Sequence, residues 1–187
     1  MSTNTVSDYS IAAKGLLESI LTGKEVANRK TLGPMVPIKL FQVLRLIGMG
    51  ASVESMVGSG SPALVYQSGQ QLGLTLGAVV YAQSGKDIKA YLKAIRDLCI
   101  TLTVGLVSLE KHDVPNNRLT LRVDECVSCA GVSGVRAPIC HYEAGLVGGL
   151  VKHFVSADSR PRNVKAIETR CNAVGDNTCA IDVEVLP

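Results

Sequence analysis

The segment Glu168-Thr169-Arg170-Cys171, followed by Gly175-Asp176-Asn177-Thr178-Cys179, carries three side chains that bind metal ions well. Thiolates and carboxylates are ordinary zinc ligands, and a structural zinc site takes four of them. Cys140 can supply the fourth, because it follows Pro138, a typical first-turn residue, and a helix N-terminus favours thiolate over thiol. We therefore predict one fully ligated, structural metal site formed by Cys140, Glu168, Cys171 and Cys179.

Alternating apolar residues flank this segment and predict the strands that support it. Residues 164–169 and 179–185 form one pair of strands, and the loop between them is longer than the two to five residues common in hairpins. Residues 102–106 and 119–123 form a second pair, joined by the turn-rich residues 113–117. A metal ion would therefore staple a loop that is too long to be held by turn geometry alone.

Apolar residues at helical spacing predict four helices in the first half of the chain, over residues 11–21, 38–47, 61–81 and 86–98. The second of these is expected to end at Gly48 and Gly50, and a fifth helix, over residues 138–154, is inserted among the strands. The predicted fold is α+β, with a helical N-terminal half packed on an antiparallel sheet. We expect an N-terminal helix and linker over 1–33 and a ligand-binding domain over 34–187.

Three glycines, Gly69, Gly73 and Gly77, recur every four residues in the third predicted helix. Each glycine costs about 1 kcal/mol of helix propensity relative to alanine, so the row indicates a close backbone approach. The approaching group is either another helix, in a tight crossing, or a ligand.

The composition excludes some classes of protein. The chain has 187 residues, of which 47% are hydrophobic, and its net charge of +3 is too mild to indicate a nucleic-acid partner. No apolar run reaches the roughly 20 residues of a membrane helix, and no secretory signal opens the chain, so we expect no membrane span and a cytoplasmic location. In a reducing compartment, six cysteines favour metal or redox chemistry over disulfides.

The pattern of Cys140, Gly145, Gly149, Glu168-x-x-Cys171, Gly175-Asp176 and Cys179 resembles that of the 4-vinyl reductase domain family. This is a small-molecule-binding domain distantly related to core subunits of vesicle-tethering complexes, and the resemblance spans roughly residue 34 to the C-terminus. It implies a homodimer, with an apolar pocket between the helices over 62–81 and 86–98 and the inner face of the sheet. It also implies that zinc is held by the four predicted ligands, as in aromatic-sensing members, and some members are associated with bacteriochlorophyll synthesis.

The pair Cys126-Val127-Ser128-Cys129 departs from the simplest family pattern by adding two thiols at the end of a predicted strand. Such a pair can be a redox couple, half of a metal site or two inert cysteines. With Cys140 and His141 it could form a second, rival zinc site, and with the other thiols an iron–sulfur cluster. We expect zinc as the cofactor and keep an iron–sulfur cluster as the alternative, because thiolate-rich sites accept both.

The function we predict is that of a stand-alone, zinc-stabilised protein that binds an apolar, aromatic or tetrapyrrole molecule as a carrier, sensor or assembly factor. Any signalling output would pass through a protein partner. No Walker loop or nucleophile elbow is present, so the sequence favours a binding protein over an enzyme and leaves catalysis open. Two other classes stay open: an iron–sulfur or redox protein, including a vinyl reductase component of chlorophyll synthesis, and a protein-binding scaffold with an empty pocket. The sequence does not identify individual ligand-binding residues.

Overall fold

The computed structural model describes residues 35–157 and 161–186, together with residues 12, 15–17, 19, 20 and 22. The chain divides into two compact units, Met1–Pro37 and Ile38–Pro187, and each is described by itself. In the first unit, the described residues between 12 and 22 are helical, in line with the predicted first helix. The rest of that helix and the linker after it lie outside the described residues.

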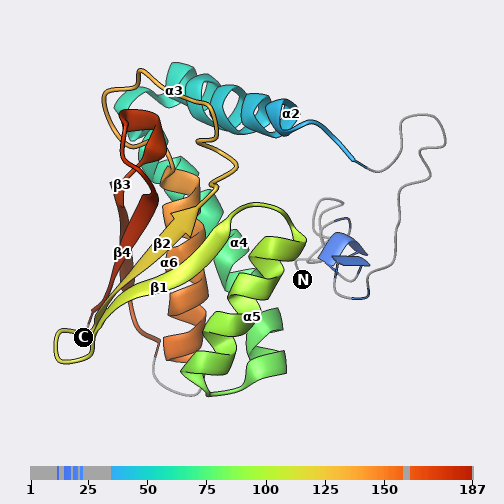
Figure 1. The fold of residues 1–187 in the computed structure, drawn as a ribbon, viewed down its shortest axis with the longest axis vertical. Helices are drawn as coiled ribbons and strands as arrows, with labels where there is room; N and C mark the ends of the chain where they lie inside the picture. The colour runs from blue at the N-terminus through green and yellow to red at the C-terminus, as the bar shows by residue number, and fades with distance from the viewer. Residues whose placement is uncertain are drawn as a thin grey trace, which may run out of the picture. The chain divides into compact units, whose positions relative to one another are not determined.

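The second unit opens with a continuous run of helix, made of α2 (Ile38–Gln42), the π-helix η1 (Val43–Ala51) and α3 (Ser52–Val57) (Figure 1). The prediction that this helix ends at Gly48 and Gly50 is therefore wrong. Both glycines lie inside the wider π-helical turns, and neither has a positive φ. The run ends instead at Gly58, whose φ of 62° leaves the helical region and starts the short 3₁₀ turn η2 (Gly58–Gly60).

Two long helices, α4 (Ser61–Ser84) and α6 (His141–Ser156), cross through their glycines. A Cβ atom at Gly69 would lie 2.0 Å from the carbonyl oxygen of Tyr142, and one at Gly145 would lie 2.0 Å from that of Tyr66. Any larger residue would force the two backbones apart. For Gly69 and Gly73, the tight helix crossing is thus the correct explanation of the glycine row. Helix α5 (Ile88–Thr101) follows α4.

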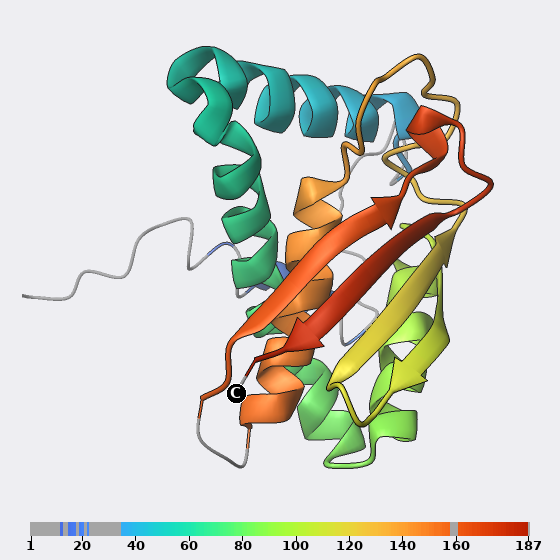
Figure 2. The ribbon, with the colours of Figure 1, turned by 90° about the vertical axis from the view of Figure 1, so that its left-hand side faces the viewer.

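The sheet has four antiparallel strands in the order β1-β2-β4-β3 (Figure 2). Their bounds are β1 Leu106–Asp113, β2 Arg118–Asp124, β3 Val164–Arg170 and β4 Cys179–Val185. Three strands match the prediction, but the segment 102–106 is not a strand before Leu106. Helix α5 extends to Thr101, and the next turns use a positive φ at Thr103 and a hydrogen bond from Val104 N to Cys99 O.

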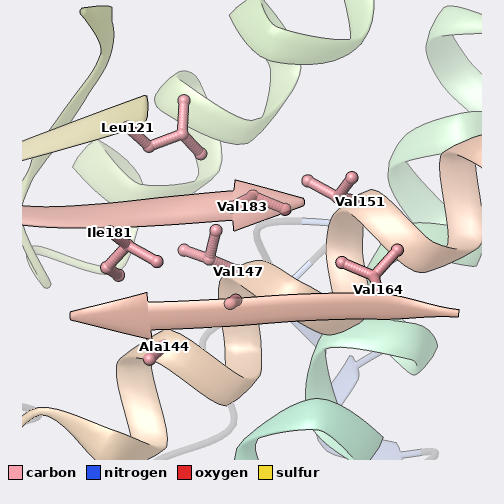
Figure 3. Packing of buried hydrophobic residues seen from close by; sticks show 8 residues of the cluster. Leu121, Ala144, Val147, Val151, Val164, Ile181 and Val183 are labelled. Carbon is pink, nitrogen blue, oxygen red and sulfur yellow. The ribbon is translucent and has the colours of Figure 1, made fainter. Parts of the chain in front are cut away.

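The main core lies between the sheet and α6 (Figure 3). Leu121, Ile181 and Val183 project from the strands onto Val147 and Val151 of the helix. The alternation of buried and exposed residues along β3 and β4 places one face of the sheet on the helices and the other in solvent. The predicted α+β class, with a helical N-terminal half and an antiparallel sheet, is confirmed.

Among the described residues, one helical stretch, Ile38–Ser84, is long and apolar enough to cross a membrane, with a mean hydropathy of 1.3 in its best window. Length and composition alone are weak evidence, and the Gly58–Gly60 turn divides this stretch into two helices that run in different directions (Figure 2). The predicted absence of a membrane span stays a prediction.

Candidate metal centre

The β3–β4 hairpin holds three of the predicted ligands in place. Glu168 lies in β3, Cys171 follows the strand, and Cys179 begins β4. Between them, Asp176 Oδ2 accepts a hydrogen bond from Cys171 N at 2.8 Å, and Gly175 turns the chain with a φ of 109°. The loop is thus ordered locally, and it brings both cysteines to the same end of the sheet.

Cys140 reaches the hairpin from the start of α6, where it is the N-cap residue. Its backbone N–H donates a hydrogen bond of 2.8 Å to Glu168 Oε2. This bond joins the helix start to the middle of the hairpin, although the two residues are far apart in the sequence. The predicted fourth ligand therefore lies beside the other three.

The loop between β2 and α6 adds the Cys126–Cys129 pair to the same place. A turn closed by the hydrogen bond from Cys129 N to Cys126 O, 3.1 Å long, directs both thiols inward. The Cys129 Sγ atom lies 3.0 Å from Cys140 Sγ and 3.4 Å from Cys171 Sγ. All five cysteines of this region are buried together.

Five ligand atoms lie within 4.8 Å of one another, from Cys129, Cys140, Glu168, Cys171 and Cys179. Tetrahedral ligands at zinc–sulfur distances of about 2.3 Å lie about 3.8 Å apart, so the spacing suits one small ion. The structure thus brings together the four predicted residues and adds Cys129. His141 is not part of this group; it lines a groove of about 570 Å³ beside Arg45 and Ser61.

The electrostatics of the group fit a bound cation. Burial raises the pKa of Glu168 to about 8, and its Oε1 atom is buried without a hydrogen-bond partner in the described part of the chain. A hydrogen bond with Cys140 lowers the pKa of Cys171 to about 4, while hydrogen bonds with its neighbours, Cys126 first, raise the pKa of Cys140. An orphaned carboxylate oxygen among thiols is what a thiophilic divalent ion would satisfy.

A buried polar network holds the loop that carries Cys126 and Cys129 against α2 and η1. Gln42 Nε2 donates hydrogen bonds to the carbonyl oxygens of Val127 and Ala130, at 3.0 and 2.8 Å. Arg45 forms a 2.8 Å ion pair with Glu143, which also accepts a 2.6 Å hydrogen bond from Ser128 Oγ. Sequence reasoning missed these residues; the available signal was a glutamine and an arginine among the apolar residues 40–49.

A partly open cavity of about 200 Å³ lies next to the candidate metal centre, between α4, α5, α6 and the inner face of the sheet. These are the elements that the resemblance implied, with α6 added. Its walls are almost entirely aliphatic or aromatic and include Leu76, Ile95, Val107, Leu150 and Ile181. Cys126 belongs both to this wall and to the buried cluster of cysteines. The cavity and the centre therefore share a boundary.

Comparisons with known proteins agree with this architecture. Residues 119–185 match the family model of the 4-vinyl reductase domain. Two uncharacterised proteins of Methanocaldococcus jannaschii are similar in sequence. MJ0150 is 28% identical over 156 residues, which are 83% of this chain and 80% of the relative. MJ1642 is 24% identical over 155 residues, 83% of this chain and 81% of the relative.

Three solved structures share the fold at low identity. A vinyl-4-reductase family protein from Methanocaldococcus jannaschii has a TM-score of 0.63 at 16% identity and is covered, like this chain, in full. The phenol-responsive sensory domain of the transcription activator PoxR, solved with phenol, has a TM-score of 0.64 at 14% identity, covering 96% of this chain and 92% of that one. A trafficking protein particle complex subunit 3 from Naegleria fowleri, covalently bound to palmitic acid, has a TM-score of 0.58 at 14% identity, covering 80% and 97%. The predicted resemblance to the 4-vinyl reductase family is confirmed, and the trafficking-complex subunit shares the fold.

Proposed function

We propose that this protein is a metal-stapled small-molecule-binding domain whose ligand occupies the apolar cavity. The observation that carries the proposal is the apolar cavity of about 200 Å³ beside a buried group of side chains that could hold a metal ion. Ligand sites are typically apolar hollows with few polar groups, and this one lies at the junction of helices and sheet. Carrier, sensor and assembly factor are all roles that such a domain performs.

The metal ion in this proposal is zinc, bound by Cys140, Glu168, Cys171 and Cys179. Donor atoms that all lie within 4.8 Å of one another favour zinc over a [4Fe–4S] cluster, in which each thiolate binds a different iron atom and the sulfur atoms lie farther apart. Four protein ligands leave no position for water or substrate, so the ion would supply structural stability. It would lock the β3–β4 hairpin to the start of α6.

The size of the cavity narrows the ligand class. A dry cavity of about 150 Å³ can hold benzene, so about 200 Å³ suits a single aromatic ring or a short aliphatic molecule. Among the ligands that the resemblance implied, this volume favours the single ring over a tetrapyrrole. The phenol in the PoxR structure and the palmitic acid in the trafficking subunit support the use of this fold for apolar ligands.

We propose that a second copy of the chain binds the exposed apolar side chains of α2, η1 and α3. Large hydrophobic side chains there are exposed, including Ile38, Leu40, Leu44, Ile47 and Met56. Several large apolar side chains exposed along one helical run favour a protein interface. The sequence resemblance implied a homodimer, and Leu44→Asp should then convert a dimer to a monomer in light scattering. We also propose that the protein is cytoplasmic and that it has no nucleic-acid partner.

The test combines metal analysis with ligand binding. One or more zinc ions per chain, little iron, and a rise in melting temperature with phenol, toluene or indole would support the proposal. Val107→Phe should abolish that rise by filling the cavity, whereas Val114→Phe, the same change at an exposed position of the β1–β2 turn, should preserve it. Iron with acid-labile sulfide would favour the redox protein instead, and zinc without binding of any of the three probes would favour the empty scaffold.

A further inference from the structure

A second pocket lies at the opposite end of the sheet from the candidate metal centre. Strand β4 begins at the centre with Cys179 and ends at this pocket with Val185. The pocket has a volume of about 260 Å³, and its walls come from α5, α6 and the strands β1, β2 and β4. It shares Ile95 with the cavity beside the metal centre, whereas Leu119 and Val151 belong to this pocket and not to that cavity. The two are therefore distinct sites.

The deep end of the pocket is apolar. Tyr91, Ile95 and Val151 line it and are almost fully buried. The Tyr91 hydroxyl donates a hydrogen bond of 2.8 Å to the carbonyl oxygen of Leu150, so this side chain offers a ligand its ring and not a free hydroxyl. A polar group placed here would be buried without a partner, which is costly. A ligand would therefore place its apolar part at this end.

The mouth of the pocket carries polar side chains that suit an anion. His112 and Asn117 line it and are exposed, and Arg162 lines it and is half-buried. His112 pairs with Leu119 across the β1–β2 ladder, and Leu119 packs on the main core, so both side chains lie on the helix-covered face of the sheet. None of the described residues that line the pocket is acidic.

Of the two arginines at the mouth, Arg162 is the one placed to bind an anion. Arg118 precedes Leu119, so its side chain points to the other face of the sheet, where it pairs with Glu184 at 2.9 Å. The backbone N–H of Arg162 donates a 3.0 Å hydrogen bond to Ser156 Oγ, which fixes the residue at the end of α6. A guanidinium stays charged in proteins and can bind a carboxylate through two N–H groups.

We propose that this pocket is a second ligand site, which binds an apolar organic acid. The apolar body lies at the deep end against Tyr91, Ile95 and Val151, and the carboxylate accepts hydrogen bonds from Arg162 and His112 at the mouth. A cavity of about 150 Å³ holds benzene, so about 260 Å³ suits a body of up to about ten carbon atoms. The site does not depend on the metal ion, and it goes beyond the aromatic ligand proposed above.

The experiment is a titration of the full chain with octanoate, followed by calorimetry and by the chemical shifts of the backbone amides. We expect saturable binding, with the largest shifts at Leu119, Val151 and Val185. Binding of 1-octanol, which has the same carbon chain without the charge, should be about tenfold weaker or more, because a charge-assisted hydrogen bond is lost.

Substitutions at the mouth test the role of the charge. Arg162→Gln should weaken octanoate binding about tenfold or more and leave octanol binding unchanged, and Arg162→Lys should restore part of the loss. Arg118→Gln is the matched control, since it removes the arginine at the same mouth that points to the other face, and it should bind octanoate as the native chain does.

Two filling variants separate this site from the cavity beside the metal centre. Leu92 lines this pocket and Val107 lines the cavity. Leu92→Phe should therefore abolish octanoate binding and keep the far-ultraviolet circular dichroism of the native chain, whereas Val107→Phe should leave octanoate binding intact.

Four results would each overturn the proposal. They are octanol binding as tight as that of octanoate, equal octanoate affinity in Arg162→Gln and the native chain, loss of octanoate binding in Val107→Phe, and no binding up to about 5 mM octanoate. The third would place the acid in the cavity beside the metal centre. The proposed function is tested separately, by metal content and by the aromatic probes, so its failure and the failure of this inference are distinguishable.

Discussion

The start and the middle of α6 are held in place by opposite means. At its start, Cys140 and the hairpin form a buried group of thiols and a carboxylate that could hold a metal ion. Along its middle, Gly145 and Gly149 press directly against the backbone of α4, with no side chain between. In the function proposed above, the first contact depends on a bound ion, whereas the second is complete in the chain itself.

This difference shows how one domain can combine a helix crossing that is stable without metal with a second contact that a bound ion would stabilise. Close packing of helices stabilises at every metal concentration, because its dispersion contacts and buried area are always present. Ligand atoms stabilise only when metal binds, and without it their burial opposes folding. The cavity lies between these two regions, so its shape depends on both.

The largest effect is expected from a methyl group in the helix crossing. A Cβ atom at Gly73 would lie 2.1 Å from the carbonyl oxygen of Leu146, and a backbone atom cannot move aside as a side chain can. Gly73→Ala should lower the free energy of unfolding by about 4 to 5 kcal/mol or prevent folding. Gly48→Ala is the control, since nothing lies within 4 Å of its added Cβ, and it should be neutral or stabilising by up to about 1 kcal/mol. Equal effects in urea unfolding would contradict the crossing.

Metal removal tests whether the start of α6 and the β3–β4 hairpin are stabilised by a bound ion. Chelation should lower the melting temperature by about 10 °C, which corresponds to about 4 kcal/mol in a chain of this size. In hydrogen exchange, the amides of Cys171 and Asn172 should lose protection while those of α4 keep theirs. Readdition of zinc should restore both measurements. Uniform loss of protection over the whole domain would show that the two regions do not differ in this way.

Loss of Glu143 probes the polar network that joins the two regions. Glu143→Ala leaves the Arg45 guanidinium, whose side chain is 4% exposed, without its partner, so we expect a loss of about 3 kcal/mol in urea unfolding. Asp97→Ala removes one partner of the exposed Lys93–Asp97 pair and should cost at most about 0.5 kcal/mol. The cost at Glu143 should persist after chelation, because it arises from buried charge and not from metal. Similar small losses in both variants would contradict the buried pair.

Much of the fold and of the candidate site could be predicted from local sequence patterns. Glu168, Cys171 and Cys179 lie within one hairpin, so alternation and loop length were enough to bring them together. Cys140 was predicted as a ligand from its position at a helix start. A close backbone approach was predicted from the spacing of the glycines in α4. In each case, the periodicity of one element determined where the side chain would lie.

The features that sequence reasoning missed depend on contacts between residues far apart in the chain, which local patterns do not predict. Cys129 reaches the centre through an irregular loop, held by Gln42 from a helix more than eighty residues earlier. Gly48 and Gly50 were expected to end a helix, but the π-helix runs past them, in the same helical run whose Gln42 and Arg45 contact distant residues. The alternation over residues 102–106 was overridden by the end of α5. Sequence spacing alone does not contain these constraints.

The smallest effect expected is at Cys99, the cysteine that lies on the cavity and outside the cluster of thiols. Burial raises the pKa of its thiol to about 11, two units above the usual 9, which lowers the thiolate fraction at pH 8 about 100-fold. Iodoacetamide should therefore modify Cys99 at least about 100-fold more slowly in the native than in the unfolded protein, measured by peptide mass spectrometry. Because the folded pKa is the higher one, the neutral thiol favours folding below pH 9, and this contribution is lost as the pH rises through 11. A ligand in the cavity should slow the reaction further, whereas a native rate equal to the unfolded one would show that the cavity wall opens freely to solvent.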